Sequence, residues 1–334
     1  MLALCACGAS ARGNASEESA DSTLSSMDAA ASVTAAIVRS FNDAVVDDYV
    51  LQSLTNGGGP VGAAQPCLTA DNRLSQRPSA LANPPYAEAS IVQRDRVVRV
   101  LGAYAFLVAT VSRDAANPDA AFAAADFERA SFALSAAANV HAQGDLFVED
   151  RAAALVASAR RPRDAREGSA IREVVVRANP AVQQLIALIR ADVAKHRLEA
   201  IAATQLELRD LLAYGAPVPA SPPSRASPAG KTPACSKPLV VLSVAAPTAP
   251  EPDVSAAIAA LAPVLRSRAE KTRQRLLALT AINFERLFDA LNEEARAAND
   301  FPLRRSKIED AARDIQRESA AIDQDGRALT SARL

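Results

Sequence analysis

Apolar residues recur every three or four positions between residues 97 and 111, and this spacing is the strongest constraint on the fold. The repeat consists of Val97, Leu101, Tyr104, Val108 and Val111. Such positions lie on one face of an α-helix, as in the seam between two coiled-coil helices, whereas a strand would bury alternate residues. The repeat therefore predicts a helix over about 87–113 that needs a helical partner. Gly102, beside the seam, would let that partner approach closely.

The composition favours the same fold class. Aromatic residues make up 4% of the chain and there is no Trp, while Ala is abundant and hydrophobic residues reach 49%. Ala has the highest helix propensity, and sheets depend on β-branched and aromatic side chains. This apolar content excludes wholesale disorder. We expect an all-α fold, an elongated antiparallel bundle with long coiled-coil-like helices.

Periodicity and the positions of Gly and Pro predict the helix boundaries. We expect helices over about 26–54, 87–113, 117–143, 146–160, 164–214, 255–299 and 300–330. Pro180 either begins a new helix or kinks the one that contains it.

Ten of the twenty prolines lie in residues 215–253, so we expect this Pro-rich segment to be a crossover without regular helix. We expect residues 26–334 to form one helical-bundle domain, in which the last helices pack against the earlier ones. The alternative is two domains, 26–214 and 254–334.

The N-terminus contains a pattern typical of lipidated bacterial proteins. The residues Leu4-Cys5-Ala6-Cys7 resemble the lipobox of bacterial lipoproteins. The resemblance implies that residues 1–7 are the remnant of a lipoprotein signal, that Cys7 carries the lipid, and that Gly8 directs the protein to the periplasmic side of the outer membrane. Six residues before Cys7 are too few for a signal peptide, so we expect an upstream start codon.

Residues 8–25 are rich in Ser, Ala and Glu, and we expect them to be a flexible tether. The alternative is a cytoplasmic protein whose two N-terminal cysteines match the lipobox by chance.

Cys67 and Cys235 are the cysteines that remain after Cys5 and Cys7, and both lie in segments that contain Pro. The oxidising cell envelope would favour a disulfide between them. Two free thiols are the alternative.

The charges are balanced, with 37 basic and 38 acidic residues, so we expect no nucleic-acid binding. The densest charge cluster is basic and consists of Arg160, Arg161, Arg163 and Arg166. These side chains are candidates for contact with an anionic partner such as a lipid headgroup, lipopolysaccharide or peptide. The alternative is a solvated turn.

The sequence carries no motif for a metal, a cofactor or catalysis. His141 and His196 lack a metal-ligand spacing, and His196 follows Val193 on one helical stripe, at the expected edge of the core. Gly230-Lys231-Thr232 lacks the first Gly of a phosphate-binding loop, and Asp323-Gln324-Asp325-Gly326 lacks two ligands of a calcium loop.

Carboxylates are expected on solvated faces. The adjacent pairs Asp47-Asp48 and Glu293-Glu294 cannot each converge on one ligand, whereas Glu285 and Asp289 share a helix face. We find no apolar run long enough to span a membrane.

These observations predict a lipid-anchored envelope protein that acts by binding another envelope protein, as a scaffold, adaptor or assembly factor, without catalysis or cofactors. One alternative is a small-ligand or lipid carrier with a cavity inside the bundle. Another is an enzyme with carboxylate or Arg chemistry. If the lipobox is a chance match, the chain is a cytoplasmic helical interaction protein.

Overall fold

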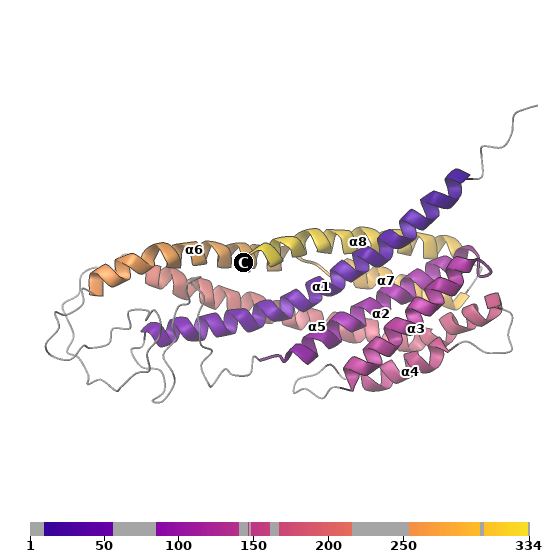
Figure 1. Cartoon of the computed structure of the whole chain (residues 1–334), viewed down its shortest axis with the longest axis horizontal. Helices are drawn as coiled ribbons and strands as arrows, with labels where there is room; N and C mark the ends of the chain where they lie inside the picture. Colours follow the sequence, from indigo (N-terminus) through magenta and orange to yellow (C-terminus); the bar gives the residue numbers. More distant parts are fainter. Residues whose placement is uncertain are drawn as a thin grey trace, which may run out of the picture. The chain divides into compact units, whose positions relative to one another are not determined.

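The computed structural model describes residues 10–55, 85–139, 146, 148–160, 167–215, 254–300 and 304–332. Within these residues every regular element is helical and none is a strand (Figure 1), which confirms the all-α prediction. The elements are α1 (Ser10–Thr55), α2 (Glu88–Arg113), α3 (Pro118–Ala138), α4 (Glu149–Ala159), α5 (Glu167–Gly215), α6 (Val254–Ala281), α7 (Glu285–Ala297), the 3-10 helix η2 (Ala298–Asp300) and α8 (Arg305–Ser331).

Two expected boundaries were wrong. Helix α1 begins at Ser10 instead of Ser26, so residues 10–25 are helical rather than an irregular tether. The Ala and Glu residues of this stretch are strong helix formers, and their propensity outweighs its polar composition.

The single helix expected over 255–299 is divided between α6 and α7. The side chain of Asn283 accepts a hydrogen bond from the backbone N–H of Glu285, at 2.9 Å, and such local bonds compete with the helical backbone. Ile282 and Phe284, on either side of Asn283, are both buried at this break.

Helix α5 continues through Pro180, which therefore lies inside one helix. Its neighbour Asn179 is buried, and its side-chain amide donates to the carbonyl oxygen of Ala295 at 2.7 Å and to the side-chain oxygen of Asn299 at 2.6 Å. These two bonds fix α5 against the end of α7 and η2.

The packing divides the chain into two compact units. Unit 1 takes residues 1–38, 87–197 and 281–327, and unit 2 takes 39–86, 198–280 and 328–334. Residues on both sides of the Pro-rich segment contribute to each unit. The Pro-rich segment itself lies outside the described residues.

Unit 1 has an apolar interior. Helix α2 packs against α3 and α7, and α3 packs against α4. All five residues of the predicted α2 seam are buried, and the ring of Tyr104 meets that of Phe127 edge-on, at 5.6 Å between centroids. Gly102 brings α1 close, because a Cβ there would lie 2.7 Å from the Cβ of Met27. The seam and the role of Gly102 were correctly predicted.

Unit 2 buries polar side chains beside apolar ones. One of its apolar clusters consists of Leu211 and Ala269, with Leu208 and Leu265 packed against them, and Leu279 and Leu329 are also fully buried. Buried polar or charged side chains of unit 2 are Ser40, Asn42, Thr204, Glu207, Asp210, Thr272 and Arg275. Large apolar side chains are exposed there instead, namely Leu198, Leu206, Leu212 and Leu277.

Candidate functional site

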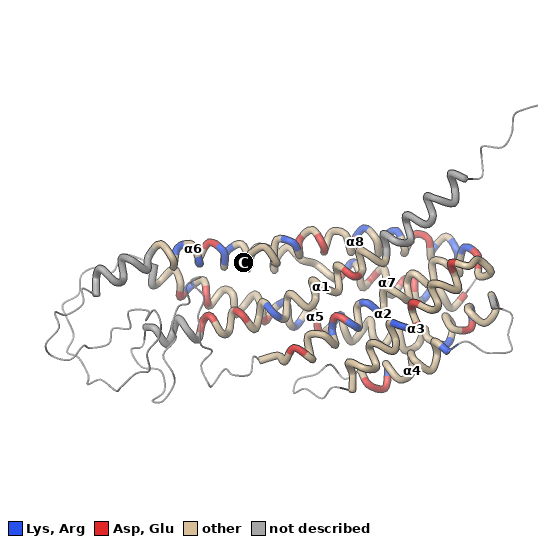
Figure 2. The backbone as a smooth tube through the Cα atoms, in the orientation of Figure 1, with Lys and Arg blue, Asp and Glu red and all other residues tan. Residues whose placement is uncertain are grey.

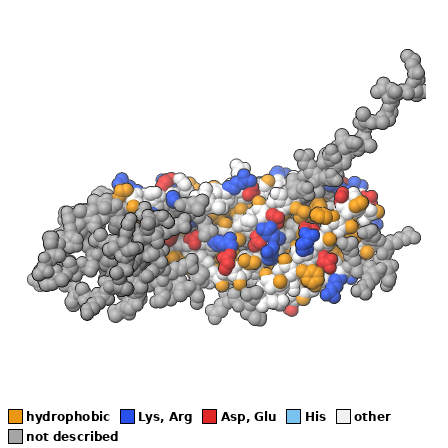
Figure 3. Space-filling model, viewed as in Figure 1, with side chains coloured by type: hydrophobic (Ala, Val, Ile, Leu, Met, Phe, Trp, Pro, Cys, Tyr) orange, Lys and Arg blue, Asp and Glu red, His pale blue; other side chains and the backbone are white. Residues whose placement is uncertain are grey.

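Helix α3 carries a second apolar stripe on its outer face. We define the outer α3 stripe as Phe122, Ala125, Arg129, Phe132 and Ala136. Phe122 is 56% exposed and Phe132 is 45% exposed, although the opposite face of α3 is buried. Hydrophobic side chains gather in the part of Figure 3 where α3 lies. Exposed apolar patches mark interaction surfaces, so this face of α3 is a candidate site.

The spacing of the outer α3 stripe fits another helix. Its members lie three, four, three and four residues apart, which is the spacing at which coiled-coil helices meet. Arg129 sits at the middle of the stripe, where its exposed guanidinium binds Asp126 at 2.8 Å. An exposed pair of this kind contributes little to stability, so the guanidinium is able to exchange Asp126 for an acidic group of a partner.

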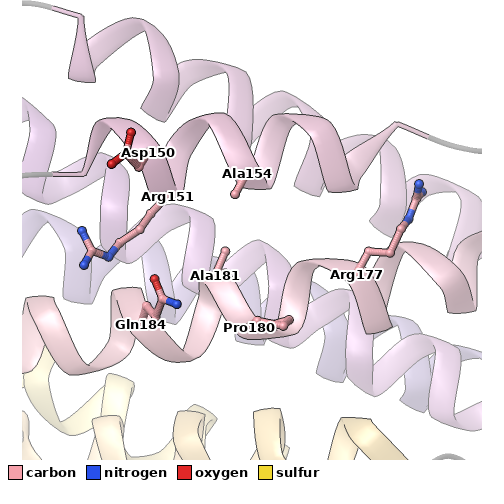
Figure 4. Close-up of a pocket in the computed structure, with 7 residues that line it drawn as sticks. All are labelled: Asp150, Arg151, Ala154, Arg177, Pro180, Ala181 and Gln184. Atoms are coloured by element: carbon pink, nitrogen blue, oxygen red, sulfur yellow. The ribbon is translucent and has the colours of Figure 1, made fainter.

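A pocket of about 290 Å³ lies between α4 and α5 (Figure 4). Its residues are Asp150, Arg151, Ala154, Arg177, Pro180, Ala181 and Gln184. Ala154 and Ala181 face each other across the middle, and the guanidinium of Arg177 turns away from it. This volume lies at the lower end of the range for small-molecule pockets, so this gap does not favour a lipid carrier.

The predicted anionic contact is described only at Arg160, which ends α4 and is exposed. Its carbonyl oxygen accepts a hydrogen bond from Nη2 of Arg177 at 2.7 Å. Arg161, Arg163 and Arg166 lie outside the described residues, so this contact stays a prediction. Elsewhere, basic and acidic residues alternate along the described helices (Figure 2).

The other predicted sites also lie outside the described residues. They are Cys5 and Cys7 of the lipobox, Cys67 and Cys235 of the proposed disulfide, and His141. Lipidation and the disulfide remain predictions.

A buried ion cluster joins α2 and α5. Arg94 binds Asp192 with two hydrogen bonds, from Nε to Oδ2 at 2.7 Å and from Nη2 to Oδ1 at 3.0 Å. Nε2 of His196 lies 3.0 Å from Nη2 of Arg94 and 3.2 Å from Oδ1 of Asp192. Burial acts to raise the pKa of Asp192, but its hydrogen bonds with His196 and Arg94 outweigh burial and lower it.

His196 is 1% exposed, so it lies inside the core rather than at its edge. Arg94 and Asp192 do not stand out in the sequence, although one signal is present. Asp192 and His196 are four residues apart on the buried stripe of α5, a spacing at which side chains meet.

Glu294 is a buried acid, and its assignment to a solvated face was wrong. It is 1% exposed, whereas Glu293 beside it is exposed. Burial raises the pKa of Glu294 well above its usual range. Leu287, Leu291 and Glu294 follow each other at intervals of four and three residues, so the periodicity of α7 places Glu294 on the buried face.

In unit 2, Glu207 of α5 is buried among groups of α6. Its carboxylate binds Arg275 and accepts a hydrogen bond from the hydroxyl of Thr272 at 3.0 Å. Burial raises the pKa of Glu207 to about 7, although the charge of Arg275 opposes this shift. Nearby, burial and a hydrogen bond with Asp210 raise the pKa of Asp48. Glu207, Asp210 and Arg275 are buried in unit 2, whereas Asp48 is half-buried.

The shared face of Glu285 and Asp289 is confirmed, because both carboxylates bind Arg190. Among the described residues, no cluster of His, Cys, Asp and Glu side chains has the arrangement of a metal site. No helix in the described part of the chain has the length and apolar character of a membrane span.

Comparisons with known proteins give no further guide to the site. No protein-family model, curated protein or solved structure matches the chain.

Proposed function

We propose that the chain is a lipid-anchored binding protein of the bacterial cell envelope that holds another envelope protein against the outer α3 stripe. The observation that carries the proposal is the pair of exposed rings, Phe122 and Phe132, at coiled-coil spacing on a helix whose opposite face is buried. Such rings lose contact with water when a partner covers them, and aromatic residues are common anchors of interfaces.

The partner is an amphipathic helix. Its apolar residues, at intervals of three and four, fill the spaces around Phe122 and Phe132. A carboxylate at the middle of its apolar face would reach Arg129, which lies between the two rings.

The placement of the ionisable groups supports binding over catalysis. Arg94 and Glu294 are each 1% exposed, so they lie where a substrate has no access, whereas catalytic groups line a cleft.

The docking surface is tested by placing a photocrosslinking phenylalanine analogue in the full chain. It is introduced at Phe122 or Phe132, and at Leu277 as a control that is equally exposed on another helix. In living envelopes we expect one adduct of the same mass from the two α3 positions and none from Leu277. An adduct of twice the chain mass would mean self-association. That result, or equal adducts at all three positions, would refute the proposed partner.

The anchor is tested separately. Expressed from an upstream start in a Gram-negative host, the chain should incorporate labelled palmitate and partition into detergent. Cys7→Ser should abolish both, and Cys5→Ser, two residues away, should leave labelling intact. An unlabelled chain with Cys7 present would refute the anchor without affecting the α3 surface.

A further inference from the structure

Helix α7 docks through an apolar face that contains one acid. Leu287, Phe288 and Leu291 are at most 3% exposed, and Glu294 lies one turn further along the same face. The helix packs against α2, whose Tyr104 interacts with the Glu294 carboxyl. A carboxyl is therefore held where every neighbour along the helix face is apolar.

Burial of this carboxyl is not offset by a charged group in the described part of the chain, since burial alone sets the direction of its pKa shift. Its Oε1 is buried without a hydrogen-bond partner among the described residues. The phenol of Tyr104 donates instead to the carbonyl oxygen of Val175, at 3.3 Å. On the neighbouring helices, Arg190 binds Glu285 and Asp289 while Arg94 binds Asp192.

Burial strongly disfavours an ionised carboxylate in such a place, so the protonated acid is the form that packs. When α7 is released, water surrounds Glu294 and its carboxyl ionises freely. Release also exposes Leu287, Phe288 and Leu291, which are otherwise buried.

We propose that Glu294 is a proton lock on α7: the helix stays docked while this carboxyl holds its proton and is released when the carboxyl ionises. Burial raises the pKa of the docked form above its ordinary value of 4.5. The stabilisation is therefore complete below that ordinary value, and it declines as the pH rises toward the raised one. In this range the ratio of released to docked helix increases about tenfold per pH unit.

Hydrogen exchange of α7 amides in the full chain tests the lock, after correction for the intrinsic pH dependence of exchange. In the wild type we expect the opening constant of α7 to rise about tenfold per pH unit as the pH increases from the ordinary pKa of 4.5 toward the raised one. Glu294→Gln, which stays neutral, should make the opening constant independent of pH. Glu293→Gln, the same change at the exposed neighbour, should keep the wild-type slope. A wild type without the slope, or a Glu294→Gln variant that keeps it, would overturn the proposal.

A measurement on the wild type covers the case in which Glu294→Gln fails to fold. With ¹³C-carboxyl glutamate, infrared spectroscopy reports protonated glutamates alone. Above the ordinary pKa of 4.5 we expect a protonated-acid band besides that of Glu207, whose pKa is about 7, and this band should be lost over the same pH range as α7 protection. Loss of that band without any loss of α7 protection would refute the lock.

Discussion

Gly326 of α8 lies so close to Val33 of α1 that a Cβ atom at position 326 would overlap Cγ2 of Val33. It would also lie 3.1 Å from the Cβ of Val33, which is bound to the rigid backbone of α1. The glycine that ends the calcium-like motif is therefore the point where two helices touch.

Gly326→Ala should destabilise the protein. In an unhindered helix this change stabilises by about 0.5–1 kcal/mol, but overpacking at a helix contact costs about 1–3 kcal/mol. Urea unfolding measures the difference. In a Val33→Ala background, where the overlapping methyl group is gone, the same change should become neutral or stabilising. A stabilising Gly326→Ala in the wild type would contradict this packing.

Arg94→Met should cost about 3–5 kcal/mol, because it leaves the carboxylate of Asp192 buried without its guanidinium. Arg190→Met is the matched control, since Arg190 also binds two groups across helices but is 37% exposed on its side chain. An exposed pair contributes at most about 1 kcal/mol. Equal losses in the two variants would show that burial does not set the energy of the Arg94 cluster.

The Asp192 pair should make stability sensitive to acid. The pKa of Asp192 in the folded chain is below its ordinary value of 3.8, because hydrogen bonds from His196 and Arg94 outweigh burial. The stabilisation is thus present above about pH 4 and is lost as the pH falls through the lower folded-state pKa. Urea unfolding should show a large difference between wild type and Asp192→Asn at about pH 6 that shrinks toward about pH 2. A difference that stays constant would contradict this linkage.

Deleting residues 254–334 should abolish cooperative unfolding of the remainder. Helices α6, α7 and α8 supply both units, and they bury Phe288, Ile308 and Ile315 completely. Each buried side chain contributes about 1.5–3 kcal/mol, and a domain's net stability is about 5–15 kcal/mol.

The control keeps every helix and cuts the chain at a protease site inserted into residues 216–253. This cut should leave a cooperative melt near that of the intact protein, as judged by circular dichroism. Separate cooperative melts of the fragments 26–253 and 254–334 would instead identify two independent domains.

Cys67 and Cys235 should form a disulfide in protein purified from the envelope. Non-reducing peptide mapping of a Cys5→Ser, Cys7→Ser variant exported with a cleavable signal should yield one linked peptide pair, which disappears on reduction. On the chain-entropy model a loop of this length contributes about 5 kcal/mol to stability. Two freely alkylated thiols in the native protein would refute the pairing.

The sequence predicted the local features of the fold best. The seam of α2 could be predicted because a helix repeats its buried face every three or four residues, and Gly102 lies beside that repeat in the sequence. The end of α6 could not be predicted in this way, because the break at Asn283 falls within a stretch that otherwise keeps helical periodicity.

The candidate sites were harder to predict. Phe122 and Phe132 are exposed on α3, and periodicity alone does not say that both faces of a helix carry apolar side chains. Arg94 and Glu294 are charged residue types that are rarely buried, so their interior positions depend on tertiary packing.

The buried polar side chains of unit 2 affect how the stability of the protein responds to temperature. Unfolding raises the heat capacity in proportion to the apolar surface it exposes, and newly exposed polar surface lowers it. Glu207, Thr272 and Arg275 are buried in unit 2. Their exposure on unfolding therefore subtracts from the heat-capacity increment that the apolar core around α2 supplies, and it reduces the curvature of the stability curve.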